Sequence, residues 1–512
     1  MSYSADLILK NANVITTEPA QPRAELIAIK GDRILLAGVN DALEQVIGAG
    51  TRVIDCEGKT VLPGFNDAHC HVFSMIRQLS SIDLSPASVR SIADIKSVIR
   101  RNAQNTLRGR WLSGTGYNEF YLAEKRHPNR RDLDEVAPEH PVVLAQRTLH
   151  ACVLNSMALR LAGIAAESEA PPGGLIERDP STGEPTGVLY EMLGYIRRKV
   201  TPPLSENEIA QGMTLANRHY LSLGITSVQE ATVTNNLEQW HTFRKFKDRL
   251  KPRLYMMLGA EAQQQFPGAG MVTGSGDSDL RAGAVKIVLS EATGRLRPSQ
   301  AELNGLVLSA HRAGFQVAMH AFEISVIEAA ITALENIGED LSARRHRIEH
   351  CSVCPPHLVK RLSKLKAVVA SQPPFVFYSG ERYLAQVPAD EQKWLYPFKS
   401  LLDSGVIVAA SSDSPIVPDN PLTGIFAAVT RQAETGQKVA AHEAVSVHQA
   451  LAMYTTSAAH ASFEEGIKGS IAPGKLADLV VLSADPTNLP PEQIKDIKVE
   501  MTILGGEVVW ER

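Results

Sequence analysis

Two histidines separated by one residue, His69 and His71, end an apolar run that begins near residue 61. In an extended chain, residues i and i+2 point to the same side, so both imidazoles can bind one metal ion. Two packed or surface histidines would give the same pattern, and the pair alone is therefore weak evidence. Its weight depends on which other residues share that end of the fold.

Three more residues of ligand type follow separate apolar runs: His320 after VAM, His350 after RIE and Asp413 after VIVAASS. The separations of 30 and 63 residues correspond to one and two strand–helix units. Imidazole and carboxylate groups suit zinc, iron, manganese or nickel. Because several independent runs place such residues at the same end, the sequence predicts a metal site there.

Lys286 interrupts the apolar run AVKIVL. A lysine inside a hydrophobic strand is costly unless it is paired or chemically altered. One interpretation pairs its amine with a carboxylate or extends it to the rim. The other is a lysine carboxylated by CO₂, whose new carboxylate bridges two metals. Spacing does not decide between them.

The elements that must position these residues are short apolar runs, each followed by a helical stretch. Together with the run at 61–71 they number eight, which predicts an α/β fold containing a (β/α)₈ barrel. The other runs cover 225–230, 253–260, 284–290, 315–320, 346–350, 366–371 and 406–412.

Both ends of the chain instead alternate short apolar runs with turn residues, a pattern typical of antiparallel strands. We therefore predict a small β-sandwich domain from residues 1–60 and 465–512, and a barrel over 61–464. The barrel carries a long insertion at about 72–222, with its own helices and at least one strand at 141–146.

Composition narrows the functional classes. The chain has 512 residues, 44% hydrophobic, and its 52 basic and 56 acidic side chains give a net charge of −4. This charge argues against nucleic acid as a partner, and no apolar stretch is long enough to cross a membrane. Only five cysteines and no signal-peptide pattern favour the cytoplasm. A small molecule is the expected partner. Homo-oligomers are common among soluble enzymes, so the sequence leaves assembly into a homo-oligomer open.

The sequence resembles the amidohydrolase superfamily of metal-dependent hydrolases over almost its whole length. The strand VIDCEGKTVLPGFNDAHCHV is similar to the superfamily's PGxxDxHxH strand, and KGSIAPGKLADLVVL is similar to its return to the terminal sheet. The stretches RDLDEVAPEHPVVLAQRTLHACVLNSMAL and GGLIERDPSTGEPTGVLYE resemble the branch that includes N-substituted formamide deformylase.

This resemblance implies a distorted barrel with a terminal β-sandwich. It also implies a divalent metal, zinc first, with one or two ions per subunit. The implied ligands are His69, His71, His320, His350 and Asp413, and carboxylated Lys286 would bridge the ions if there are two. Asp413 would also be the general base, and His350 would complete the metal shell or stabilise the oxyanion.

His150 matches a histidine that the branch carries in its insertion, so it is a candidate for substrate contact, with a structural hydrogen bond as the alternative. The chain departs from the branch at two places. Ser290 and Glu291 stand where an Asp-Gly pair usually follows the lysine, and Glu323 and Ile324 replace a Gly-Asp pair after the fifth-strand histidine. These changes alter the neighbours of the ligands, so substrate specificity does not transfer.

The predicted reaction is hydrolysis of a C–N bond in an amide, formamide, carbamate or cyclic amide by metal-activated water. The same framework supports ester hydrolysis, deamination, decarboxylation or hydration, which differ in their products. A non-catalytic scaffold is the remaining class. Retention of His69, His71, His320, His350 and Asp413 argues against it.

Overall fold

The computed structural model describes residues 4–171, 173–291 and 295–512. The chain forms two compact units, one of Met1–His71 with Asn217–Arg512 and the other of Val72–Ala216. Among the described residues, no helix combines the length and apolarity that crossing a membrane requires.

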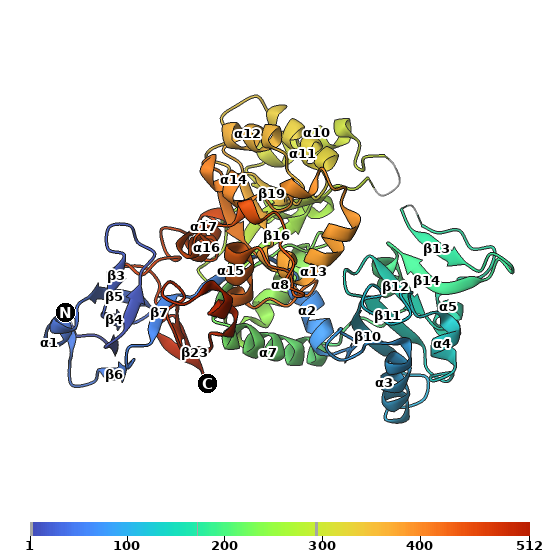
Figure 1. Cartoon of the computed structure of the whole chain (residues 1–512), viewed down its shortest axis with the longest axis horizontal. Coiled ribbons are helices and arrows are strands. Elements are labelled where there is room, and N and C mark those ends of the chain that lie inside the picture. The colour runs from blue at the N-terminus through green and yellow to red at the C-terminus, as the bar shows by residue number, and fades with distance from the viewer. Residues whose placement is uncertain (1–3, 172, 292–294) are drawn as a thin grey trace. The chain divides into compact units, whose positions relative to one another are not determined.

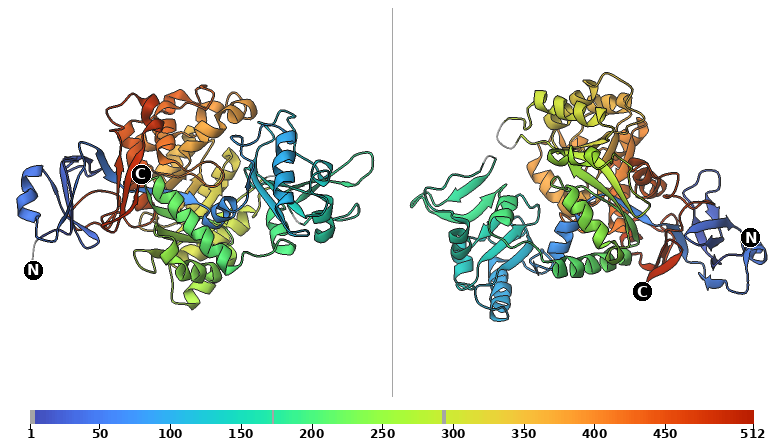
Figure 2. Two further views of the ribbon diagram at one scale, coloured as in Figure 1. Left: turned by 90° about the horizontal axis from the view of Figure 1, so that it is seen from below. Right: turned by 180° about the vertical axis from the view of Figure 1, so that it is seen from behind.

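An eight-stranded sheet forms the centre of the first unit, and all of its ladders are parallel (Figure 1). Its strands follow the chain in order, so each connection returns to the same end of the sheet and the helices lie outside it (Figure 2). The predicted α/β barrel-type fold is confirmed. The strands are β8 (Phe65–Cys70), β15 (Ile225–Glu230), β16 (Arg253–Gly259), β17 (Leu280–Val288), β18 (Val317–Ala321), β19 (Arg347–His350), β20 (Val368–Ser371) and β21 (Ile407–Ala410).

Amphipathic helices connect these strands and bury their apolar residues against the sheet. α12, for example, buries Leu358, Val359 and Leu362 along one face. The helices of this part are α7 (Glu206–Ser222), α8 (Leu237–Lys245), α9 (Gln265–Gly268), α10 (Gln300–Arg312), α11 (Ile324–Glu335), α12 (Pro356–Leu365), α13 (Pro373–Gln386), α14 (Phe398–Asp403), α15 (Pro421–Thr430), α16 (Val447–Met453) and α17 (Thr456–Ala461).

The first and last strands of the sheet, β8 and β21, meet through the isolated bridge between Cys70 and Ser414. Backbone hydrogen bonds flank this bridge: the Asp413 N–H donates to the His69 carbonyl at 2.8 Å, and the His71 N–H donates to the Ser414 carbonyl at 2.8 Å. The barrel therefore closes at the place where the predicted ligands of both strands emerge.

The run at 61–71, which we predicted as one strand, is two strands in two sheets. β7 (Thr60–Pro63) pairs with the C-terminal β22 (Leu479–Leu482), and β8 begins the barrel. Gly64 separates them, and a Cβ atom at this position would lie only 2.2 Å from Thr226 Oγ1. The close approach of two strands thus requires a glycine at the crossing.

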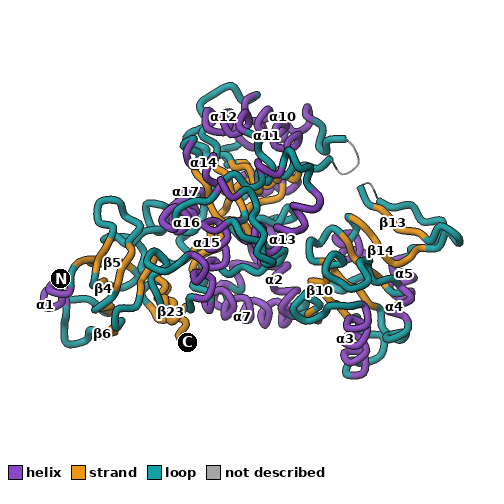
Figure 3. Tube along the Cα trace, viewed as in Figure 1, coloured by secondary structure: helices purple, strands orange, loops and turns teal. Residues whose placement is uncertain are grey.

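Residues from both ends of the chain form the β-sandwich, which Figure 3 shows as orange strands. One sheet uses the N-terminal part alone, with β1 (Leu7–Lys10), β4 (Leu26–Lys30), β5 (Arg33–Gly38) and β6 (Arg52–Asp55), and a short helix α1 (Leu43–Val46) follows β5. The other combines both ends, with β2 (Asn13–Ile15), β3 (Arg23–Ala24), β7, β22, β23 (Val499–Leu504) and β24 (Glu507–Glu511). A shared core of buried residues, including Leu9, Ile27, Leu479 and Ile503, joins the two sheets.

The second unit contains a six-stranded mixed sheet, where the sequence predicted at least one strand at 141–146. Its strands are β9 (Ile82–Asp83), β10 (Leu112–Tyr117), β11 (Val142–Gln146), β12 (Ala151–Leu154), β13 (Leu175–Arg178) and β14 (Pro185–Tyr190). Its helices are α2 (Val72–Leu79), α3 (Ile92–Gln104), α4 (Arg130–Asp134), α5 (Ser156–Ala162) and α6 (Leu193–Lys199).

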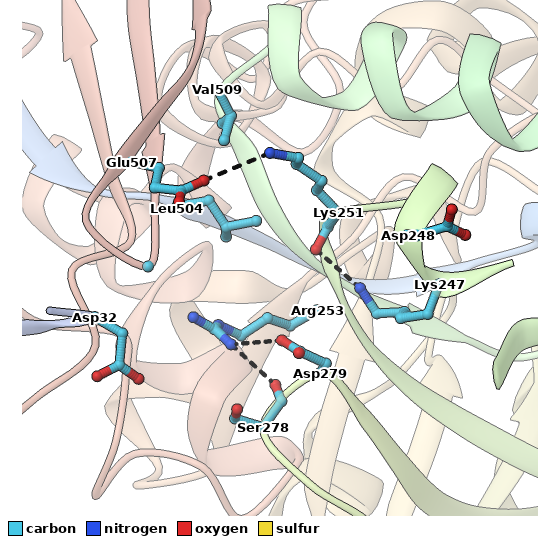
Figure 4. Close-up of a pocket in the computed structure, with 11 residues that line it drawn as sticks. Asp32, Lys247, Asp248, Lys251, Arg253, Ser278, Asp279, Leu504, Glu507 and Val509 are labelled. Carbon is cyan, nitrogen blue, oxygen red and sulfur yellow. Dashed lines mark hydrogen bonds and ion pairs between the residues drawn. The ribbon is translucent and has the colours of Figure 1, made fainter.

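Ion pairs hold the N-terminal end of the barrel against the sandwich. Arg253, the first residue of β16, donates from Nε and Nη2 to the two oxygens of Asp478 at 2.5 and 2.9 Å. Its Nη1 donates to Asp279 at 2.9 Å and to the Ser278 carbonyl at 3.3 Å, on the wall of a cavity of about 370 Å³ (Figure 4). Asp478 also accepts the Gly505 N–H at 2.8 Å, so this buried charge is well partnered.

Candidate metal centre

Ligand-type atoms of β8 and of the loop after β21 converge at the C-terminal end of the barrel. Asp413 Oδ1 lies 3.0 Å from His71 Nε2 and 3.5 Å from His69 Nε2. The ligand atoms of these three residues all lie within 4.8 Å of one another. Two imidazoles and a carboxylate at this separation match the donor set of a divalent transition metal.

The other ring nitrogen of each histidine is already engaged. His69 Nδ1 lies 2.5 Å from Glu349 Oε2, His71 Nδ1 lies 2.9 Å from Thr232 Oγ1, and His350 Nδ1 lies 2.8 Å from Gln372 Oε1. The oxygens of a carboxylate and an amide carbonyl can only accept, so His69 and His350 donate from Nδ1. Their Nε2 atoms are left with a lone pair, which is the form that binds a metal.

His350 Nε2 is buried without a hydrogen-bond partner, and Asp413 Oδ1 has the ring nitrogens of His71 and His69 beside it at 3.0 and 3.5 Å but makes no well-aligned hydrogen bond. Buried acceptors without a partner are rare in folded proteins because each one costs about 1–3 kcal/mol. Both atoms are acceptors, and a cation is the partner that acceptors lack. The residues present therefore fit a divalent metal.

Three residues of this region have a left-handed backbone conformation. His350, Cys351 and Asp413 have φ angles of 73°, 52° and 58°, in the left-handed region that residues other than glycine seldom occupy. Each costs on the order of 1 kcal/mol or more. Such a conformation persists only where the surrounding structure enforces it. At these strand ends it lowers stability, which is common at functional sites.

Burial keeps the histidines uncharged. It lowers the pKa of His69 well below its ordinary value, and the nearby Lys286 amine lowers it further. Burial has the same effect on the pKa of His350, with His320 as the next cause. A metal displaces protons from its ligands, so imidazoles that are already neutral bind at a lower cost.

Lys286 lies in the middle of β17 with 2% of its surface exposed, and its Nζ is 3.4 Å from His69 Nε2. Burial lowers its pKa to about 8, although the carboxylates of Glu349 and Asp413 oppose the shift. About a tenth of the amine is therefore neutral at pH 7, and the neutral amine is the form that reacts with CO₂.

His320 ends up beside the triad of His69, His71 and Asp413. Its ring centroid is 4.4 Å from that of His350, which in turn lies 5.0 Å from that of His69. Among the described residues, the compact three-ligand group does not include His320 or His350. The six predicted ligands thus occupy one rim as two adjoining groups, and their role as ligands stays a prediction.

The remaining candidate, His150, lies in the second unit directly before β12. Its Nδ1 is 2.7 Å from Glu191 Oε1, and 64% of its side chain is exposed. Its substrate role stays a prediction. Cys351 and Cys354, which form a CxxC, are buried free thiols.

Sequence reasoning missed the residues that engage the ligand histidines: Thr232, Glu349 and Gln372. Glu230, at the end of β15, is completely buried and accepts the Thr232 N–H at 2.8 Å. One signal was available. In the strand RIEH, Arg347 and Glu349 are two residues apart, so both charges point to the same side of an otherwise apolar strand.

Comparison with known proteins gives matches that span the chain. The Amidohydrolase family matches residues 52–510. N-substituted formamide deformylase of Arthrobacter pascens is 29% identical and is covered over 99% of its length by 100% of this chain. The putative amidohydrolase YtcJ of Bacillus subtilis is 26% identical, with 96% of each chain covered.

Solved structures of similar fold also match almost the whole chain. A metal-dependent hydrolase from Pyrococcus furiosus matches with a TM-score of 0.74 and 26% identity, covering 94% of this chain and all of the other. A metal-dependent hydrolase from Pyrococcus horikoshii matches with a TM-score of 0.76 and 23% identity, over 95% and 99% of the two chains. At that lower identity the likeness is one of fold.

Proposed function

This chain belongs to the amidohydrolase family and is a hydrolase of carbon–nitrogen bonds other than peptide bonds, and from this premise we propose that it cleaves an amide-type bond of a small molecule with metal-activated water. The observation that carries the proposal is the convergence of His69, His71 and Asp413 near His350 Nε2, a buried acceptor without a hydrogen-bond partner. Closely spaced ligand-type atoms and a buried acceptor without a partner fit a bound cation better than they fit a packed structural core.

His69, His71, His320, His350 and Asp413 would hold the metal, with zinc favoured for this donor set. A bound divalent ion supplies an activated water near neutral pH and a positive charge that polarises a carbonyl oxygen. Asp413 takes a proton from the attacking water at its carboxylate and delivers it to the leaving nitrogen. His350 completes the ligand set or stabilises the developing oxyanion.

We further propose that Lys286 is carboxylated and bridges two ions. Two features support this: the complete burial of an amine whose pKa lies at about 8, and the second histidine group formed by His320 and His350. The test is metal quantification together with the mass of the Lys286 peptide, prepared under conditions that preserve a carbamate. A single ion and an unmodified lysine would contradict the two-metal form and leave the one-metal form standing.

For the substrate, the relative named as an N-substituted formamide deformylase makes formamides the first members of a test panel, followed by other amides, carbamates and cyclic amides. His150 is kept as a candidate for substrate contact. We expect a small molecule in the cytoplasm as the substrate, without nucleic acid or membrane, and the net charge of −4 with five free cysteines supports this setting.

The deciding experiment compares metal-depleted, zinc-restored and Asp413→Asn protein on this panel, with identification of products. We expect amine release that disappears with a chelator and returns with zinc. Release of alcohol, ammonia or CO₂ instead would indicate ester hydrolysis, deamination or decarboxylation at the same site, and a change by addition of water alone would indicate hydration. Protein that binds no divalent metal would overturn the proposal.

A further inference from the structure

A completely buried ion pair lies behind the metal centre. Arg347 and Glu349 of β19 both have fully buried side chains. The guanidinium donates from Nε to Glu349 Oε1 at 2.8 Å and from Nη2 to Glu349 Oε2 at 3.0 Å. That second oxygen also accepts from His69 Nδ1 at 2.5 Å. One carboxylate thus joins an arginine fork to a predicted metal ligand.

We propose that Glu349 is a positioning residue for the metal centre: its carboxylate accepts the Nδ1–H of His69 and so fixes the imidazole with Nε2 free for the ion, while the Arg347 fork holds the carboxylate in place. This inference rests on the proposed metal site. It adds a functional role to residues that bind no metal and touch no substrate.

A comparison with two of the other ligand histidines, His71 and His350, shows what is particular to Glu349. His71 is met by the Thr232 hydroxyl and His350 by the Gln372 amide, and both of these partners are neutral. A hydroxyl donates or accepts as needed, and an amide can turn its nitrogen toward the ring. An ionised carboxylate only accepts, so of His69, His71 and His350 it is His69 whose tautomer is fixed by charge. A charged acceptor also raises the basicity of the imidazole as a ligand.

Arg347 also contacts β8, the strand that carries His69. Arg347 donates from Nη2 to the Ala68 carbonyl at 2.8 Å, one residue before His69 on β8. From Nη1 it donates to Gln229 Oε1 of β15 at 2.5 Å. The guanidinium therefore joins β19 to the neighbouring strands β8 and β15, which are not adjacent to β19 in the sheet. This fixes the distance between the carboxylate and the ring it orients.

Stability alone does not explain the pair. Taking both charges out of water costs several kcal/mol for each ion, and apolar residues of the same volume often stabilise a fold as well or better. Small apolar residues such as Ala68, Ala284 and Ala318 are buried on strands of the same barrel, together with polar residues such as Gln229 and Lys286. A charged pair in this setting is accounted for by what it does to His69.

Glu349→Gln replaces the carboxylate with an amide of the same shape. The amide oxygen is drawn to the Arg347 fork, which leaves its NH₂ facing His69 Nδ1. His69 must then accept at Nδ1 and carry its proton on Nε2, the atom that the metal needs. We expect zinc affinity, measured by competition with a chelator, to fall about 10- to 100-fold.

Asp478→Asn is the matched control, because Asp478 is also a buried carboxylate held by an arginine fork and one further donor. It neutralises the same kind of charge at the other end of the barrel. We expect it to lower the melting temperature with zinc affinity within about threefold of wild type. Equal loss of zinc affinity in the two variants would overturn the proposal, since a general loss of stability would then explain both.

Glu349→Asp separates positioning from packing. It keeps the charge but shortens the side chain, whereas Glu349→Gln keeps the shape and loses the charge. Positioning predicts that zinc affinity falls in the order Glu, Asp, Gln, and a purely structural role predicts Glu, Gln, Asp. The second order, or zinc affinity in Glu349→Gln equal to wild type, refutes the inference alone. Wild-type protein that binds no zinc refutes it together with the proposed function.

Discussion

The two ends of the barrel both bury charge, and they treat it in opposite ways. At the N-terminal end, Arg253 donates from each of its three side-chain nitrogens, and Asp478 is fully engaged. At the C-terminal end, the buried His350 Nε2 has no hydrogen-bond partner, and Asp413 Oδ1 lies beside the ring nitrogens of His71 and His69 without a well-aligned hydrogen bond. Burial of charge therefore does not mark a functional site by itself. What distinguishes the C-terminal end is that ligand-type atoms from separate strands converge there.

The largest effect we expect is that of Asp413→Asn on catalysis. The amide cannot take a proton from water, so kcat should fall about 10²- to 10⁴-fold. The metal-free variant should be as stable as wild type or more so, because asparagine tolerates the left-handed backbone at φ 58° and buries no charge. Steady-state kinetics and urea denaturation check the two parts. A large loss of stability would mean that Asp413 serves the fold.

Asp478→Asn tests the opposite end. Leaving the Arg253 guanidinium without its anionic partner should lower the free energy of unfolding by about 3 kcal/mol. Activity per bound metal should stay near that of wild type, since the residue lies at the end of the barrel away from the ligands. Denaturation and kinetics on one preparation measure both. A selective loss of kcat without loss of stability would break the contrast between the ends.

The same contrast explains what the sequence could predict. The strands and the ligand-type residues His320 and Asp413 are local patterns, because a hydrophobic run followed by a polar residue is visible in one segment. The partners Thr232 and Gln372 are not. Each meets its histidine only after separate strands become neighbours, β8 and β15 for Thr232 and β19 and β20 for Gln372, and both are ordinary polar residues. The division of 61–71 at Gly64 escaped for a similar reason, because it depends on the approach of Thr226 from another strand.

Gln372→Leu tests the neutral acceptors at the C-terminal end. His350 would lose the partner of its Nδ1–H, a hydrogen bond whose net contribution is about 1 kcal/mol. Zinc affinity should therefore fall about fivefold, less than in Glu349→Gln. Chelator competition on both variants in parallel gives the comparison. A loss as large as that of Glu349→Gln would show that the charge of the acceptor makes no difference.

The smallest effect concerns a second histidine–carboxylate pair, His219 with Asp419, whose Nε2 and Oδ1 atoms are 2.7 Å apart. Burial opposes the charge of His219, but the Asp419 carboxylate prevails and raises its pKa. His69 has a carboxylate partner too, yet its pKa is lowered, since its burial is complete and the Lys286 and Arg347 cations stand nearby. A raised pKa stabilises the fold fully below the unfolded value of about 6.5 and loses that contribution as pH rises through the folded value. The excess stability of wild type over His219→Gln in urea should therefore shrink from pH 6 to about pH 9. An excess that grows with pH would show that the charge of His219 is disfavoured, as that of His69 is.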